Sequence, residues 1–413
     1  MFGMGYLVVQ LAVQDGVPHL APLYLGLVGL ARAIPGFTFG LFGGVVADRA
    51  DRRRLLLTTQ VLAASTSTLL AALTIAGRID IVTVILIAAI NSLIFSFDIP
   101  SRQAMVPRLV PERDLMSAIG LNSAAFNGPQ VIGPVIGGLI ATAVGATGGA
   151  LAGVGWLFAI NAASYGAVIL ALWLMAPVPT EGRRDTPVLR SIREGLGYIR
   201  REQVILWVIV LVALTALLSR PYIQLLPAVA HEMDLGALEL SWLFAASGIG
   251  SLLGALATAS LGNVRRRGVV LVASALTMTG LQVLFGAQRS LVLALPLLAL
   301  LGVATMIFMG MGNTLLQTRT PDHLRGRVMS VNSMMFMGFM PLGSMVLGSI
   351  ATIVGVANSF IVGAAVIAAV SAYVALRVPA VRRATSQPRH RRAHGQVHPH
   401  AVHPEARNGT AAE

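Results

Sequence analysis

Ionisable side chains inside apolar segments are the residues of this chain most suited to chemistry. Arg32 lies in an apolar run near 22–47, and Asp98 lies close to the end of another such run. Charges at membrane depth are costly, so each one predicts a functional or a paired group. Arg32 would attract an anionic substrate or hold a carboxylate, unless it only hydrogen-bonds carbonyls of neighbouring helices. Arg102 follows Asp98 by one helical turn, which favours an ion pair over a proton carrier.

Uncharged polar side chains in other apolar runs predict the lining of a cavity. Their amide and phenol groups can hydrogen-bond hydroxyl and carbonyl groups of a substrate, although many such groups only bridge helices, at about 0.6 kcal/mol each. With Arg32, the candidates for substrate contact are Asn122, Asn127, Gln130, Tyr222, Gln224, Asn313 and Asn332.

Near the end of its run, Arg220 is expected to extend outward to water. It precedes Pro221 and Pro227, which predict a break in the helix near the outer side of the membrane. Such a break would be a plausible gate for a substrate.

The patterns of enzymes are missing from the sequence. There is no cysteine, and no nucleophile–base pair, metal-ligand cluster or Gly-rich nucleotide loop with lysine. Most of the histidines lie between residues 390 and 403, where we expect a solvated tail rather than a metal site. We therefore expect a protein that is not an enzyme and holds neither a metal nor a cofactor.

The elements that must position these groups are membrane helices. Hydrophobic residues form 55% of the chain and charged residues 11%, against about 25% charged in soluble proteins, and the mean hydropathy is +0.77. Apolar runs that can cross about 30 Å of hydrocarbon recur throughout. The expected spans lie near residues 1–13, 22–47, 55–76, 81–97, 115–145, 151–174, 203–229, 239–261, 268–287, 290–314, 328–354 and 357–376.

The positive charge reports topology rather than a nucleic-acid partner. The formal net charge is +13, and every basic residue is arginine. Arginines gather on alternate loops, whereas the opposite side has only Arg78 and Arg289. By the positive-inside rule, the arginine-rich loops, the linker between the halves and the C-terminal tail are cytoplasmic. These expectations describe a multi-pass membrane protein, with the lipid bilayer as its surroundings.

The two halves of the sequence repeat each other. Residues 140–145 (IATAVG) recur at 350–355 (IATIVG), and Asn122 and Gly133 recur as Asn332 and Gly343 in the same register. Self-similarity at this distance predicts two equivalent helical bundles with a substrate path between them.

The same register places the start of the first helix before Met1. The short apolar run ahead of Gln14 would span only about 20 Å, so we hypothesise a truncated N-terminus or a start codon assigned too late.

The loop after the second span is GGVVADRADRRR, which resembles the loop between helices 2 and 3 of the major facilitator superfamily. Asp51 stands where the family pattern usually has a second glycine. The resemblance implies a latch between the two bundles, and the matching residues are Gly44, Asp48, Arg49, Arg52 and Arg53. Ordinary positive-inside arginines would account for the basic residues alone.

The fifth span carries NGPQVIGPVIGG, which resembles the antiporter signature of exporters in this superfamily. The matching residues are Gly133, Pro134, Gly137 and Gly138, although small-residue packing would also account for them. Together with FSFDIPSRQAMVPRLVPERDL and PDHLRGRVMS, the signature resembles the enterobactin-exporter and macrolide-efflux branch.

The expected fold is an all-α polytopic membrane protein of twelve transmembrane helices in two six-helix bundles. We place the N-terminal bundle at 1–175, a cytoplasmic linker with an amphipathic surface helix at 176–202, the C-terminal bundle at 203–378 and a disordered tail at 379–413.

The resemblance implies a monomeric secondary transporter that exports amphiphilic drugs or siderophore-like molecules, with a proton gradient as the drive for antiport. Two alternatives stay open. One is an importer of a small organic anion that uses Arg32, and the other is a membrane receptor or scaffold without transport.

Overall fold

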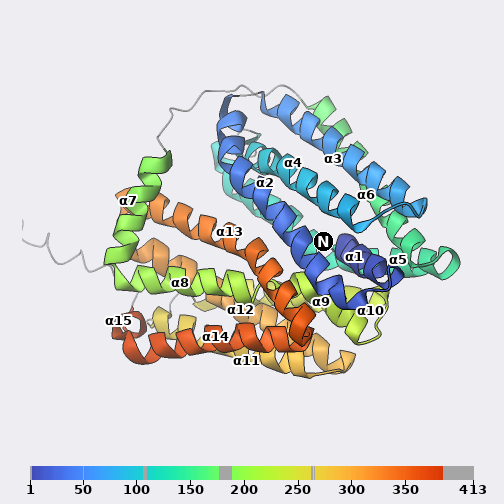
Figure 1. The fold of residues 1–413 in the computed structure, drawn as a ribbon. Coiled ribbons are helices and arrows are strands. Elements are labelled where there is room, and N and C mark those ends of the chain that lie inside the picture. The colour runs from blue at the N-terminus through green and yellow to red at the C-terminus, as the bar shows by residue number, and fades with distance from the viewer. Residues whose placement is uncertain are drawn as a thin grey trace, which may run out of the picture.

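The computed structural model describes residues 2–49, 51–105, 109–175, 188–261, 264 and 266–384. The described chain is helical throughout, without a strand, and Figure 1 shows two groups of long helices that lean against each other. The first group is α1 (Phe2–Gln14), α2 (Ala21–Arg49), α3 (Arg52–Ile75), α4 (Ile81–Met105), α5 (Leu115–Gly148) and α6 (Ala150–Leu174). The second is α8 (Gln203–Leu218), α9 (Tyr222–Glu232), α10 (Ala237–Ser260), α11 (Arg267–Ala287), α12 (Leu291–Arg319), α13 (Asp322–Val354) and α14 (Val356–Arg377).

Helices of this length and composition fit a bilayer. Within the described residues, ten segments are long and apolar enough to cross a membrane, and α1 is a shorter apolar helix. Large side chains such as Ile353 (84% exposed) and Leu376 (72% exposed) lie on the flanks. Such side chains are stable against lipid tails, and helices satisfy their own backbone hydrogen bonds there. The chain is an all-α polytopic membrane protein, as predicted, while the count of twelve spans stays a prediction.

The seventh span is interrupted, as its sequence predicts, but at one proline rather than two. The break lies at Ser219–Pro221, between α8 and α9, whereas Pro227 lies inside α9. Gln282 of α11 closes the break by accepting from Ser219 Oγ at 2.6 Å and donating to the Leu218 carbonyl at 3.5 Å. A neighbouring side chain thus satisfies backbone that the helix itself leaves free.

The expectation that Arg220 extends outward to water is wrong. Its Nε and Nη1 atoms are buried and have no hydrogen-bond partner within the described residues. Because the helix breaks at this residue, Arg220 lies between two half-spans and not at a helix end that faces water.

Two short helices lie against the C-terminal bundle at the arginine-rich end. The amphipathic stretch of the linker forms α7 (Val188–Arg201), whose Glu194 pairs with Arg327 of α13 and whose Ile199 is buried. Residues 176–187 of the linker lie outside the described residues.

The predicted start of the disordered tail at residue 379 is wrong by several residues. Pro379–Arg382 forms α15, which packs on α8, α11 and α14. Val381 and Ala384 are fully buried, and this apolar burial holds the segment against the bundle. Residues 385–413 lie outside the described part.

Candidate substrate cavity and bundle interface

The two bundles meet through α2 against α13 and through α5 against α10. The α2–α13 contact involves the first turns of α2. A Cβ added to Gly26 would lie 2.7 Å from the Ser344 carbonyl oxygen, and one added to Gly29 would lie 2.8 Å from Ser344 Cβ. Small residues let helix backbones approach this closely. From this contact α2 and α13 diverge toward the end where α7 lies (Figure 1), so the bundles are closed at the arginine-poor end.

The same position of the repeat makes both bundle contacts. Gly138 on α5 faces Ser241 of α10, and Gly348 on α13 faces the Pro22 carbonyl of α2. A Cβ at either glycine would overlap its neighbour. The two glycines are equivalent in the register that aligns residues 140–145 with 350–355. The duplication therefore supplies one close contact on each side of the interface.

The antiporter signature divides between two surroundings. Gly137 packs on Phe2, where an added Cβ would lie 3.1 Å from the ring, and Gly138 contacts the opposite bundle. Gly133 has open space around it. Pro134 lies inside α5, which continues through it. Only part of the signature is thus closely packed, and its function in antiport stays a prediction.

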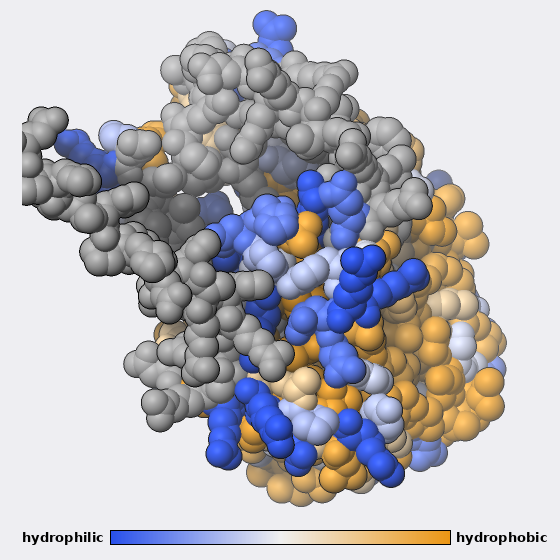
Figure 2. All heavy atoms as spheres, turned by 90° about the vertical axis from the view of Figure 1, so that its left-hand side faces the viewer, coloured by the Kyte–Doolittle hydropathy of each residue, from blue (hydrophilic) through white to orange (hydrophobic). Residues whose placement is uncertain are grey.

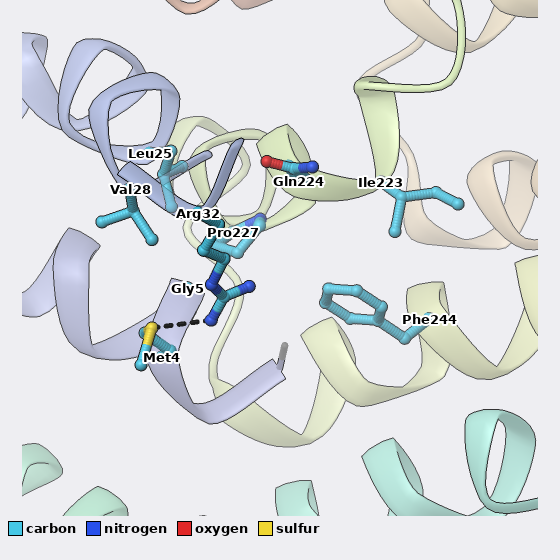
Figure 3. Close-up of a pocket in the computed structure, with 9 residues that line it drawn as sticks. All are labelled: Met4, Gly5, Leu25, Val28, Arg32, Ile223, Gln224, Pro227 and Phe244. Atoms are coloured by element: carbon cyan, nitrogen blue, oxygen red, sulfur yellow. Dashed lines mark hydrogen bonds between the residues drawn. The ribbon is translucent and has the colours of Figure 1, made fainter. Parts of the chain in front are cut away.

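A small cavity lies at the closed end of the interface, between residues of both bundles (Figure 3). Its volume is about 30 Å³, room for a water molecule but far below the several hundred Å³ of a drug-sized site. The lining residues come from α1, α2, α9 and α10: Met4, Gly5, Leu25, Val28, Arg32, Ile223, Gln224, Pro227 and Phe244.

Arg32 is the charged group of this cavity. Its guanidinium points from α2 toward Met4, with Phe244 and Gln224 on the other side of the space (Figure 3). Nη2 lies 2.8 Å from Met4 Sδ, a weak acceptor. Within the described residues no carboxylate pairs with Arg32. A guanidinium with several free donors in an apolar cavity suits an anionic or strongly polar ligand group.

The other cavity candidates are dispersed. Gln224 joins Arg32 in the cavity, whereas Tyr222 is buried in the C-terminal bundle and shares a 2.8 Å hydrogen bond with Ser247. Asn332 donates to Asn313 at 3.4 Å, an ordinary bridge between helices. The side chains of Asn122 and Gln130 are exposed, and that of Asn127 lies outside the described residues.

Asp98 forms a polar cluster within the N-terminal bundle. Its side chain is 4% exposed and lies 3.1 Å from Arg102 Nη2. It also accepts hydrogen bonds from Thr59 Oγ1 at 2.9 Å and Gln60 Nε2 at 2.7 Å. These donors stabilise the charged carboxylate and join α4 to α3. The sequence indicated the arginine but not the two partners on α3.

The predicted latch loop is described only in part. Gly44, Asp48 and Arg49 lie in the last turns of α2 and Arg52 at the start of α3, but their side chains lie outside the described residues. The function of these residues as a latch stays a prediction.

Arg53 and Asp51 hold the described part of this loop. Arg53 donates to the Leu172 carbonyl at 2.7 Å and to the Trp173 carbonyl, both at the end of α6. A cation at a helix C-terminus satisfies carbonyls that lack an intrahelical partner. Asp51 accepts from the Arg53 and Arg54 amides as the N-cap of α3. Its carboxylate thus caps a helix where the family pattern usually has glycine.

Residues that the sequence did not single out complete the interface. They are Met4, Phe244, Ser344, Gly26, Gly29 and Gly348. Two signals could have found the glycines: the spacing of Gly26 and Gly29 along one helix face, and the repeat register that relates Gly138 to Gly348.

Comparisons with known proteins agree with this architecture. A family model described as "Transmembrane secretion effector" matches residues 12–408. The enterobactin exporter EntS of Shigella boydii serotype 4 is 27% identical over 305 residues, which cover 73% of this chain and 71% of EntS. EntS of Escherichia coli O139:H28 is 26% identical over 304 residues, with the same coverage.

Solved structures of similar fold are transporters. A D-xylose–proton symporter has a TM-score of 0.70 at 15% identity and covers 93% of this chain and 96% of its own. A bacterial homolog of the human lysosomal transporter Spinster, inward-facing and unoccupied, has a TM-score of 0.67 at 15% identity, with 93% and 94% covered. At these identities the likeness identifies the fold alone.

Proposed function

The chain belongs to the transmembrane secretion effector family of the major facilitator superfamily, and on that basis we propose that this multi-pass membrane transporter exports amphiphilic drugs or siderophore-like molecules. One observation carries the proposal. Arg32 and Gln224, from opposite bundles, line the same cavity at the closed end of the interface. A group bound there would contact both bundles at once, so its binding is coupled to their relative position.

The transport cycle would be alternating access. With the bundles closed at the arginine-poor end, a substrate enters from the arginine-rich end, which the positive-inside rule assigns to the cytoplasm. Rocking of the bundles would part the contacts at Gly138 and Gly348 and open the other end. Under this topology, the linker and the C-terminus are cytoplasmic in a bacterial inner membrane. The loop from Gly44 to Arg53 would act as the latch of one state.

The named relatives and the predicted antiporter signature support export. EntS is called an enterobactin exporter, and the signature lies where α5 meets the other bundle. We take proton antiport as the drive. In the described structure the buried carboxylate of Asp98 is neutralised by Arg102 and two hydrogen-bond donors, which makes it an ion-pair partner rather than a free proton carrier.

Everted membrane vesicles test the proposal, because export from cells becomes uptake into such vesicles. Vesicles energised by respiration should accumulate enterobactin as the probe, and a protonophore should abolish the accumulation. Arg32→Gln should reduce the initial rate about tenfold, equivalent to about 1.4 kcal/mol of lost interaction. Arg78→Gln removes an exposed arginine from the turn between α3 and α4, outside the cavity lining, and should leave the rate unchanged.

A panel of macrolides and other amphiphilic antibiotics, given to cells that express the protein, extends the test. A fall in susceptibility that the protonophore reverses supports export of that class. Neither accumulation nor altered susceptibility for any compound would contradict export. Accumulation that persists with the protonophore would contradict proton antiport alone.

The second candidate is an importer of a small organic anion. It is favoured by Arg32, whose guanidinium faces the cavity without a carboxylate partner in the described part of the chain. Uptake of such anions by intact cells, rather than by everted vesicles, would support import over export.

A further inference from the structure

A group of arginines at the end of the C-terminal bundle takes no part in the proposed transport cycle. Arg266 directly precedes α11, Arg382 ends α15 and Arg383 follows it. With Val269 these residues line an open hollow of about 560 Å³. Three positive charges therefore border one space at the arginine-rich end of the protein.

These charges have no neutralising partner in the described part of the chain. Within the described residues, no ion pair or side-chain hydrogen bond involves Arg266, Arg382 or Arg383. The neighbouring Arg325 and Arg327 at the same end do have carboxylate partners, Asp322 and Glu194. The hollow thus concentrates unpaired positive charge, which favours an anion.

One wall of the hollow, α15, is packed firmly against the start of α11. Val381 and Ala384 are fully buried, and the Val381 carbonyl packs so closely on Gly268 that a Cβ there would overlap it. This contact holds α15 against the start of α11. Arg382 and Arg383 are therefore held beside Arg266.

Exposed apolar side chains lie on the helices that contact α15. On α11, Val269 is 41% exposed, and on the adjacent α14, Leu376 is 72% exposed and Tyr373 51%. Figure 2 shows the arginine-rich face with its hydrophilic side chains beside an apolar flank. A ligand that satisfied both surfaces would have an anionic head and hydrocarbon chains.

We propose that Arg266, Arg382 and Arg383 bind the phosphate group of an anionic phospholipid, whose acyl chains lie along α11 and α14. Guanidinium groups match phosphate oxygens in paired hydrogen bonds, and basic pockets at the cytoplasmic side of membrane helices suit lipid headgroups. The lipid would join α15 to the membrane surface and brace this end of the C-terminal bundle.

Native mass spectrometry of the purified full chain, after titration with phosphatidylglycerol or phosphatidylcholine, tests the site. We expect one phosphatidylglycerol to be retained in preference to phosphatidylcholine. Each of Arg266→Gln, Arg382→Gln and Arg383→Gln should weaken retention about fivefold, as expected for one arginine near an anionic headgroup. Excess inorganic phosphate should not displace the lipid, because it lacks the chains.

A matched variant separates the site from total charge. The triple substitution Arg113→Gln, Arg200→Gln and Arg201→Gln removes three exposed arginines from the same end outside the hollow, and it should retain phosphatidylglycerol like the wild type. Gly268→Ala keeps every arginine but should displace α15 and weaken retention. Circular dichroism checks that each variant is folded.

Three outcomes would overturn the site. They are equal retention of the two lipids, full retention by the triple variant Arg266→Gln, Arg382→Gln and Arg383→Gln, and a loss in the matched variant equal to that in this triple variant. Displacement by phosphate alone would show an ion site instead of a lipid site. None of these readouts depends on transport, so the site can fail while the proposed function stands.

Discussion

Asp98 of the N-terminal bundle and Phe308 of the C-terminal bundle occupy equivalent positions of the repeat, on α4 and α12, which begin at equivalent residues. Asp98 is surrounded by Thr59, Gln60 and Arg102. Phe308 is fully buried in an apolar cluster with Val208, Leu271 and Val272. One half keeps a charge at this depth, and the other fills the place with hydrocarbon.

The difference indicates a division of labour between halves of common origin. A buried carboxylate with three partners is costly to keep unless its charge is used. A buried phenylalanine contributes stability without such a cost. At this position of the repeat, we therefore expect the Asp98 ion pair to matter for transport and Phe308 to matter for the stability of the C-terminal bundle. Four comparisons of variants test this contrast.

The largest effect is expected for stability in the C-terminal bundle. Phe308→Ala should lower the free energy of unfolding by about 3–5 kcal/mol, because it leaves a cavity in a packed cluster. Asp98→Asn should cost about 1–2 kcal/mol, because Thr59 and Gln60 can still donate to the amide oxygen. Thermal unfolding in detergent compares the two. A larger loss for Asp98→Asn would reverse the proposed division.

The order should be opposite for transport. Asp98→Asn removes the charge that holds Arg102, so enterobactin uptake by everted vesicles should fall about tenfold or more. Phe308→Leu keeps most of the apolar volume and should change the rate less than about twofold. Equal losses in the two variants would place the ionisable chemistry in neither half in particular.

Substitutions of Gly138 and Gly348 test whether the two equivalent bundle contacts contribute equally to the closed end of the interface. Gly138→Ala and Gly348→Ala should each weaken the closed end by about 1–3 kcal/mol through overpacking. Gly133→Ala, in open space, is the matched control. Because the chain has no cysteine, spin labels at Arg78→Cys and Ser290→Cys can report the separation of the bundles at that end. Unchanged separation in both glycine variants would refute this account of the contact.

The smallest effect concerns the equivalent residues Asp80 and Ser290, which precede α4 and α12. Hydrogen bonds from the Thr83 hydroxyl and backbone hold the pKa of Asp80 below its usual value, whereas Ser290 makes no capping bond. A lowered pKa stabilises the fold above the unfolded-state pKa, and the contribution is lost as pH falls through the folded-state pKa.

A pH series measures this capping difference. Asp80→Asn should lower the melting temperature slightly at pH 6, and the gap from the wild type should close toward pH 3. Ser290→Ala should show no pH-dependent gap. A gap for Asp80→Asn that widened at low pH would contradict the sign of the pKa shift.

The all-α membrane fold could be predicted from the sequence because membrane helices are recognised by the length of their apolar segments and by the placement of arginines in the loops. The duplication also predicted two bundles. The latch loop and the antiporter signature followed from resemblance, and their functions remain predictions. The break of the seventh span was predicted from Pro221, while Pro227 proved compatible with α9.

The side-chain environment was harder to predict. Tyr222 and Gln224 are close in sequence, but only Gln224 lines the cavity with Arg32. Which face of a broken helix turns inward depends on the geometry of the break, and apolar periodicity does not encode it. The hydrogen-bond donors to Asp98, Thr59 and Gln60, come from a different helix, so their contact depends on how α3 packs on α4.

The interruption between α8 and α9 makes α9 a short, separate helix whose sequence can change independently of the rest of the span. Only 11 residues form α9, yet Ile223, Gln224 and Pro227 make up its share of the cavity wall. Glu232 anchors the far end of α9 through Arg289 and the Val356 amide. Substitutions within α9 would therefore change the shape of the cavity without altering the helices around it. Such substitutions offer a simple evolutionary route to different ligands.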